Sequence, residues 1–246
     1  MSRSVIRMTI DDAEHYTPEE RQAIIDSYPP HEREARVKGI PSMGSGRVFP
    51  IAQEQIECDP MPIPDEWVLI NGIDFGWDHP TAAVQLAWDR DADCLYVTKE
   101  YKQREATPII HAAAIRAWGE WVPVAWPHDG LQHDKQSGVT LADSYREQHL
   151  EMLADKATFE DGKNGLEAGV MEMLERMQTG RWKVFRNCQA WFQEFSLYHR
   201  VDGLINPIKD DLLAASRYAM MMKRFAENKP KPRGNKRKDN SGWMTL

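Results

Sequence analysis

The chain has 246 residues, of which 41% are hydrophobic and 28% are charged, as is usual for a folded globular protein. No apolar run approaches the roughly 20 residues that cross a bilayer, and the N-terminal residues lack the apolar stretch of a signal peptide. The net charge of −7 argues against a protein that coats nucleic acid through bulk electrostatics, but it does not exclude an enzyme that uses divalent cations. The three cysteines are far apart and lack metal-ligand spacing, so we expect reduced thiols.

The first 64 residues are predicted to form a short helical segment and an extended linker. Thr17 caps the first helix, a proline follows it, and Glu20 completes a capping box. We expect this helix to end near Ser27 and a second short helix to cover residues 31–38. Gly and Pro residues then favour a loop-rich connection, and the segment is too short for a core of its own.

From Trp67 onward, the hydrophobic pattern alternates between strands and helices. Strands are predicted at residues 68–74, 82–88, 94–101, 122–126 and 182–185, with a weak strand at 152–159 and a turn or hairpin at 201–205. Helices are predicted at residues 108–118, 141–150, 190–199 and 211–225, with another that begins near 166 and ends before Gly180. Three strands in hairpin succession followed by alternating helices and strands predict an α/β fold with a mixed sheet and helices on both faces. This order resembles the ribonuclease H-like arrangement.

Acidic residues occupy three positions that this arrangement brings to one edge of the sheet. Asp74 ends the first strand, Asp129 follows the fourth strand, and Asp210 with Asp211 opens the last helix. A carboxylate at the end of a buried strand is costly unless it is paired or binds a cation. Phosphodiester hydrolysis with two divalent ions needs several carboxylates around the metals. The pattern therefore favours a metal-dependent nuclease in which Asp74, Asp129, Asp210 and Asp211 are the catalytic and metal-ligating residues.

Each of these acids also has a structural interpretation. An Asp before a Gly is commonly a turn residue, and Asp210 could be the N-cap of the last helix. Five further residues are candidates for a second metal shell or a phosphate contact, although a solvated surface role is the more common one for such side chains. They are Asp78, His79, His128, Asp134 and Lys135.

The chain resembles the C-terminal nuclease domain, with its preceding connector, of the terminase large subunit of tailed bacteriophages. The similar motifs are Gly72-Ile-Asp-Phe-Gly76 with Asp78-His-Pro80, Trp126-Pro-His-Asp-Gly130 and Asp210-Asp-Leu-Leu-Ala-Ala-Ser-Arg-Tyr-Ala219. Residues 16–20, 30–36, 39–41 and 46–50 resemble the connector. Alignment on Arg217-Tyr218 puts the third catalytic position on Asp210, whereas Ala214 replaces a later aspartate of the family. The third acid is therefore left open between Asp210 and Asp211.

The resemblance implies a two-metal-ion endonuclease, using Mg²⁺ or Mn²⁺, that cuts double-stranded concatemeric phage DNA during genome packaging. It also implies the portal protein and the small terminase subunit as partners, and the host-cell cytoplasm during virion assembly as the location. No Gly-x-x-x-x-Gly-Lys-Ser/Thr phosphate loop occurs in the sequence, so we predict that the ATPase motor domain is missing from this chain.

The sequence thus predicts three parts: a helical connector or linker over residues 1–64, an RNase H-like nuclease domain over residues 65–227 and a basic flexible tail over residues 228–246. The tail could add DNA affinity or simply be a solubilising end. Two alternatives stay open: a non-catalytic RNase H-like docking module for the portal or DNA, and a resolvase- or integrase-type nuclease of the same fold. The connector-like segment favours the terminase interpretation over both.

Overall fold

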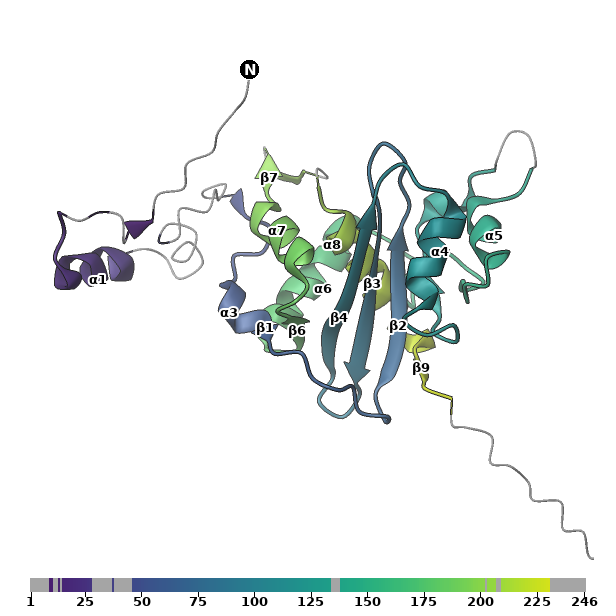
Figure 1. The fold of residues 1–246 in the computed structure, drawn as a ribbon, viewed down its shortest axis with the longest axis horizontal. Coiled ribbons are helices and arrows are strands. Elements are labelled where there is room, and N and C mark those ends of the chain that lie inside the picture. Colours follow the sequence, from purple (N-terminus) through teal and green to yellow (C-terminus); the bar gives the residue numbers. More distant parts are fainter. Residues whose placement is uncertain are drawn as a thin grey trace, which may run out of the picture.

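A mixed β-sheet organises the computed structural model, which describes residues 9–10, 13, 15–27, 37, 46–133, 138–201, 203–206 and 209–230 (Figure 1). Within these residues the strand order is β1-β6-β4-β3-β2-β5, and β9 also pairs with β2. The strands are β1 (Glu57–Cys58), β2 (Val68–Asp74), β3 (Thr81–Asp89), β4 (Cys94–Gln103), β5 (Val124–Ala125), β6 (Trp182–Phe185) and β9 (Glu227–Asn228), and a separate hairpin joins β7 (Arg200–Val201) and β8 (Leu204–Ile205).

The centre of the sheet is an antiparallel meander of β2, β3 and β4, flanked by parallel strands. β6 runs parallel to β4, and β5 runs parallel to β2. The tight β3–β4 connection is stabilised by Asp89, whose side chain accepts hydrogen bonds from the backbone N–H groups of Asp91 and Ala92. This mixed sheet confirms the predicted α/β fold class.

Helices cover both faces of the sheet, as predicted. One face carries α6 (Leu166–Gln178), α7 (Gln189–Leu197) and α8 (Asp211–Met221), and the other carries α4 (Pro108–Arg116) and α5 (Leu141–Arg146) (Figure 1). Successive residues of β2 serve the two faces in turn. Ile70 belongs to the α6–α8 core and Ile73 to the α4–α5 core, because neighbouring side chains of a strand point to opposite sides.

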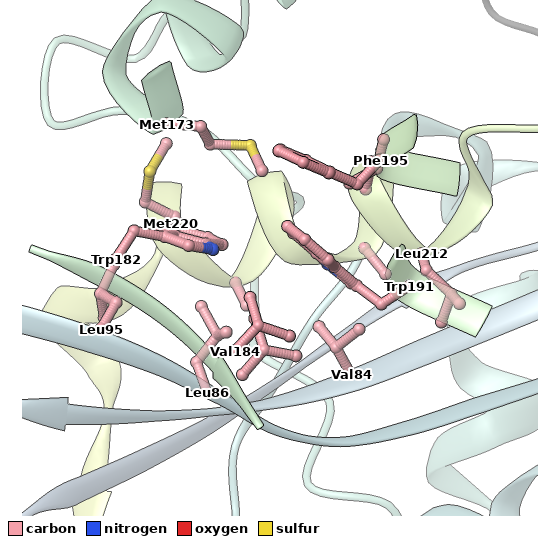
Figure 2. Packing of buried hydrophobic residues seen from close by; sticks show 14 of the residues in the cluster. Val84, Leu86, Leu95, Met173, Trp182, Val184, Trp191, Phe195, Leu212 and Met220 are labelled. Atoms are coloured by element: carbon pink, nitrogen blue, oxygen red, sulfur yellow. The ribbon is translucent and has the colours of Figure 1, made fainter. Parts of the chain in front are cut away.

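Large aromatic and sulfur-containing side chains fill the space between the sheet and α6, α7 and α8 (Figure 2). Trp191 stacks on Phe195 with ring centroids 5.4 Å apart, and both side chains are buried. The Trp191 indole donates a hydrogen bond of 2.9 Å to the Ser216 hydroxyl on α8, so the polar atom of this core residue is satisfied. The Trp and Met residues of this region thus pack as core.

Helix α8 lies unusually close to β2. A Cβ atom at Gly72 would overlap the backbone carbonyl of Ala215 and lie 3.0 Å from the Cβ of Ala219. Ala82, the neighbour of Asp74 on β3, is also small and fully buried. Small residues on both surfaces therefore allow the helix to run directly over the strands that end in the candidate site.

Most strand and helix boundaries lie within a few residues of their predicted positions, and the predicted strands at residues 68–74 and 182–185 match β2 and β6. The predicted capping box is also confirmed, since the Glu20 N–H donates to Thr17 Oγ1 at 3.2 Å and the Thr17 N–H donates to Glu20 Oε2 at 2.9 Å. That helix is α1 (Pro18–Ser27).

Some predicted elements differ in extent or cannot be compared. Residues 152–159 form an isolated bridge from Val124 to Met152 instead of a strand, and the last helix ends at Met221 before the 3₁₀ turn η4 (Lys223–Phe225). The predicted helix at residues 31–38 and most of the predicted tail lie outside the described residues.

The predicted division into three parts stays a prediction, and two observations concern its boundaries. Val48, Phe49 and Ile56 are buried in the main core, and α3 (Gln53–Ile56) leads directly into β1 on the sheet edge. Asn228, at the start of the predicted tail, belongs to β9 and pairs with Val68 of β2. None of the described helices is long and apolar enough to cross a membrane, and Cys58, Cys94 and Cys188 are free thiols.

Replacing Gly72 with Ala should destabilise the protein strongly, because the new methyl group would overlap the Ala215 carbonyl. We expect a loss of about 2–4 kcal/mol in the free energy of unfolding, measured by urea denaturation. Gly165→Ala is the matched control, since a Cβ there meets only the Ala168 methyl at 3.9 Å. Equal stability losses in the two variants would contradict the close packing of α8.

Candidate functional site

Asp74 is the last residue of β2 and lies on the face covered by α8. In the register of the central strands, Asp74 pairs with Ala82, which in turn pairs with Lys102. Residues paired across antiparallel strands point to the same face, so the side chains of Asp74 and Lys102 flank the small Ala82 side chain. Asp74 is partly buried between this strand row and the start of α8.

Asp129 lies just beyond β5, the strand that runs parallel to β2. The register pairs Gly72 with Ala125, so the chain leaves β5 beside the end of β2 and forms the 3₁₀ turn η3 (His128–Leu131). Gly130 is required in this turn, because a Cβ there would overlap the Trp126 ring and lie 3.1 Å from the Phe75 ring. This close packing fixes the exposed Asp129 next to the residues that follow Asp74.

Asp210 and Asp211 begin α8, but Asp210 does not act as a side-chain cap. Asp210 is the N-cap residue by position, and its side chain makes no cap hydrogen bond. The buried Glu194 of α7 serves instead, since its Oε2 accepts hydrogen bonds from the N–H groups of Leu212 at 2.7 Å and Leu213 at 3.2 Å. The capping alternative for Asp210 is therefore not supported, and both aspartates are available for other roles.

The four acids act on one another electrostatically. Burial raises the pKa of Asp74 to about 8, and the carboxylates of Asp211, Asp210 and Asp129 contribute to this rise while the Arg217 guanidinium opposes it. Burial and the neighbouring Asp211 also raise the pKa of Asp210, against a hydrogen bond from Tyr198. Like charges in a partly dry site disfavour one another's ionised forms, which identifies this edge as a concentration of negative charge.

Two cations lie beside these carboxylates. The Lys102 ammonium forms an ion pair of 2.7 Å with Asp211 Oδ2 and a second ion pair with Glu194. Burial lowers the pKa of Lys102, but the bonds to Asp211 and Glu194 outweigh it and raise the pKa overall. Burial raises the pKa of Glu194 to about 7, although Lys102 opposes that shift.

Arg217 is the second cation and is buried between α6, α8 and the acids. Its side chain crosses α6 at Gly169, where a Cβ would lie 2.5 Å from the Arg217 Cδ, and its guanidinium lies 4.5 Å from the Tyr218 ring centroid. Burial raises the pKa of Tyr218 to about 12, and Asp74 and Asp129 add to that shift. Arg217 and Tyr218 thus form the inner wall of the acidic site.

The donor set fits a divalent cation of the Mg²⁺ type, which prefers carboxylate oxygens and relieves repulsion among clustered acids. Within the part of the chain that the structure describes, however, no group of three or more His, Cys, Asp or Glu side chains is arranged to hold a metal ion. The acids are therefore close enough to influence Asp74 but are not gathered into a ligand shell.

Three of the five outer candidates lie among the described residues, and all three are exposed outside the cluster. Asp78 and His79 are exposed in the bend after β2. His128 is exposed as well, and its Nδ1 lies 2.8 Å from the Lys156 ammonium. The remaining two, Asp134 and Lys135, lie outside the described residues.

Lys102 and Glu194 were not among the residues predicted from the sequence, and Arg217 served there only as an alignment position. A faint signal for Glu194 exists, because a glutamate within the aromatic run Trp191–Phe195 is a charged residue on an apolar helix face. Lys102 has no comparable signal, since its partner Glu194 is 92 positions away and charges alternate throughout that end of β4.

The sheet order, the helices on both faces and the acids at one sheet edge define a ribonuclease H-like α/β protein. The family "Terminase RNaseH-like domain" matches residues 71–223, and "Terminase large subunit, T4likevirus-type, N-terminal" matches residues 2–56. The chain therefore belongs to the terminase large-subunit family of bacteriophages.

Individual relatives agree with this assignment. The chain is 50% identical over 226 residues to the terminase large subunit of Salmonella phage P22, a match that covers 92% of the chain and 45% of that protein. The P22 large terminase nuclease domain matches with a TM-score of 0.71 and 46% identity, covering 76% of the chain and 97% of that structure. The large terminase of a thermophilic bacteriophage shares the fold at 15% identity and a TM-score of 0.57, covering 88% of the chain and 55% of that protein. The chain thus spans about half the length of the full-length relatives it matches.

Asp74→Asn should stabilise the protein in the absence of metal. In the unfolded chain the carboxyl ionises near its usual pKa, whereas in the native state its pKa is about 8, so native stability falls as the pH rises from about 4 to 8. Asparagine removes this loss, and we expect the variant to gain about 2 kcal/mol at pH 8, or about 4–8 °C in Tm, and less at pH 5.

Thermal unfolding in EDTA at both pH values measures the effect. Asp65→Asn is the control, because Asp65 is exposed at the opposite end of β2. An Asp74→Asn variant with unchanged or lowered Tm at pH 8 would contradict the repulsion assigned to this site.

Proposed function

We propose that this chain is a metal-dependent endonuclease that hydrolyses phosphodiester bonds in double-stranded DNA with two Mg²⁺ or Mn²⁺ ions. The observation that carries the proposal is that Asp74 ends β2, Asp129 follows the parallel neighbour β5, and Asp210 and Asp211 begin the helix packed on β2, so acids from three distant sequence segments act on Asp74. The P22 relative, whose structure is described as a large terminase nuclease domain, supports the same activity.

Asp74, Asp129 and Asp211 would hold the ions, and Asp210 is the alternative to Asp211. Divalent ions in such a site supply an activated water and neutralise charge on the leaving oxygen. The protein's own part is to fix the carboxylates on rigid elements: Asp74 at a strand end, Asp211 on the first turn of α8 and Asp129 on the packed turn η3. The positive charge of the buried Arg217 offsets part of the repulsion that the other acids exert on Asp74.

The family membership suggests the biological substrate. A terminase nuclease would cut concatemeric phage DNA during genome packaging, in the host-cell cytoplasm while virions assemble, together with the portal protein, the small subunit and an ATPase motor. The phosphate loop of such a motor is missing from this sequence, and the match covers 45% of the P22 large subunit, so we assign only the cutting step to this chain. Family membership favours this role over that of a resolvase or integrase.

Asp74→Asn should reduce cleavage of supercoiled plasmid by more than about 1,000-fold while the protein stays folded, because the residue at the centre of the carboxylates would lose the negative charge that would hold a divalent cation. The assay compares nicking in Mg²⁺, Mn²⁺ and EDTA, with Asp65→Asn as the control that keeps wild-type activity. A folded wild-type protein that leaves plasmid intact in both metals would instead support the docking-module alternative.

Asp211→Asn should reduce cleavage more than Asp210→Asn, by about 100-fold or more against about tenfold. Asp211 forms an ion pair with Lys102, whose position on β4 is aligned with Asp74 across the sheet. Asp210 instead forms a hydrogen bond with Tyr198, the residue that follows α7. Single-turnover cleavage rates at saturating Mn²⁺ measure the difference. The reverse order of the two variants would assign the third ligand to Asp210.

A further inference from the structure

Lys102 contacts the candidate site but has no role in the proposed hydrolysis. Its ammonium bonds Asp211 Oδ2 at 2.7 Å and also Glu194 Oε1, so one cation is shared by two carboxylates. The Lys102 side chain is 26% exposed, against 4% for Glu194 and 11% for Asp211. Solvent therefore reaches the cation more easily than it reaches either partner.

Glu194 ties this ion pair to the backbone of α8. While Oε1 contacts Lys102, Oε2 accepts the N–H groups of Leu212 and Leu213, the two residues that follow Asp211. Buried carboxylates that accept backbone N–H bonds at a helix start are strongly held. The first turn of α8, and with it Asp211, is thus fixed relative to β4 and α7.

We propose that Lys102 is a positioning residue that occupies Asp211 when no metal is bound and competes with the divalent ion for that carboxylate. This inference rests on the proposed metal site. It explains why a metal-free cluster of acids can fold with Asp211 buried, since the lysine supplies the positive charge that the ion would otherwise provide. It also assigns Glu194 a second task, because Glu194 draws part of the Lys102 charge away from Asp211.

The two partners should then affect metal binding in opposite directions. Lys102→Met removes a positive charge that repels the incoming ion and occupies its ligand, so Mn²⁺ should bind roughly tenfold more tightly. Glu194→Gln keeps an oxygen acceptor for the α8 backbone but leaves the ammonium to Asp211 alone, so Mn²⁺ should bind roughly threefold or more weakly.

The experiment is isothermal titration of the full chain with MnCl₂ in the absence of DNA, so that binding is read without activity. Lys102→Arg should stay near the wild-type affinity, since it keeps the charge. Lys99→Met is the matched control, because Lys99 lies on β4 but lines a cavity on the other face of the sheet with Gln85 and Trp118. It should leave the affinity unchanged.

An Asp211→Asn background completes the test as a double-mutant cycle. If Lys102 acts through Asp211, Lys102→Met should tighten binding much less in that background than in the wild type. Circular dichroism checks that each variant is folded. If Lys102→Met does not fold, the Mn²⁺ affinity of Glu194→Gln alone tests the inference.

The outcomes separate this inference from the proposed function. A wild-type chain that binds no Mn²⁺ would overturn the metal site and the inference together. Binding that Asp74→Asn abolishes, but that Lys102→Met leaves unchanged or weakens, would overturn only the role of Lys102. Unchanged or tighter binding by Glu194→Gln would overturn it in the same way.

Discussion

Close packing of α8 on β2 is the constraint on which the site depends. Gly72 on the strand and Ala215 on the helix lie so near each other that no side chain fits between them. A helix in that position must begin above the end of β2, and its first turn carries Asp211 and Asp210. A larger residue at either contact would lift the helix and move those carboxylates away from Asp74 before any change reached the acids themselves.

The same packing concentrates negative charge where water is scarce. Asp74 is held in a state in which ionisation is unfavourable, because it is partly buried and three carboxylates act on it. Such an arrangement costs folding stability and persists where it serves a function. Two cations reduce the cost: Lys102 on β4 pairs with Asp211, and Arg217, packed against α6, lowers the pKa of Asp74.

The fold could be predicted in detail because its signals are local, whereas the candidate site could be predicted only in part because its contacts cross the sequence. The apolar run that ends at Asp74 has strand length and clear ends, and its boundaries are confirmed; the weak run at residues 152–159 had no such ends, and there a single bridge forms. Asp129 and Asp211 were indicated by their places at element ends. The cap on α8 was misassigned in the alternative that gave it to Asp210, since the capping oxygen belongs to Glu194 on another helix. No local pattern reveals such a tertiary cap, or an ion pair that spans 92 positions.

The negative charge around Asp74 bears on how the proposed site would bind DNA. A chain of net charge −7 with four aspartates at its candidate site repels a phosphate backbone, so DNA gains no electrostatic attraction there from the protein alone. The acids are not gathered into a ligand shell among the described residues, and mutual repulsion disfavours such a shell when no cation is present. A divalent ion, if bound as proposed, would change both conditions at once, because it would attract the carboxylates and present positive charge to the phosphate. In the proposed function, metal and DNA binding would therefore be coupled by the same electrostatics, and the repulsion among the acids would disfavour DNA binding without the ions.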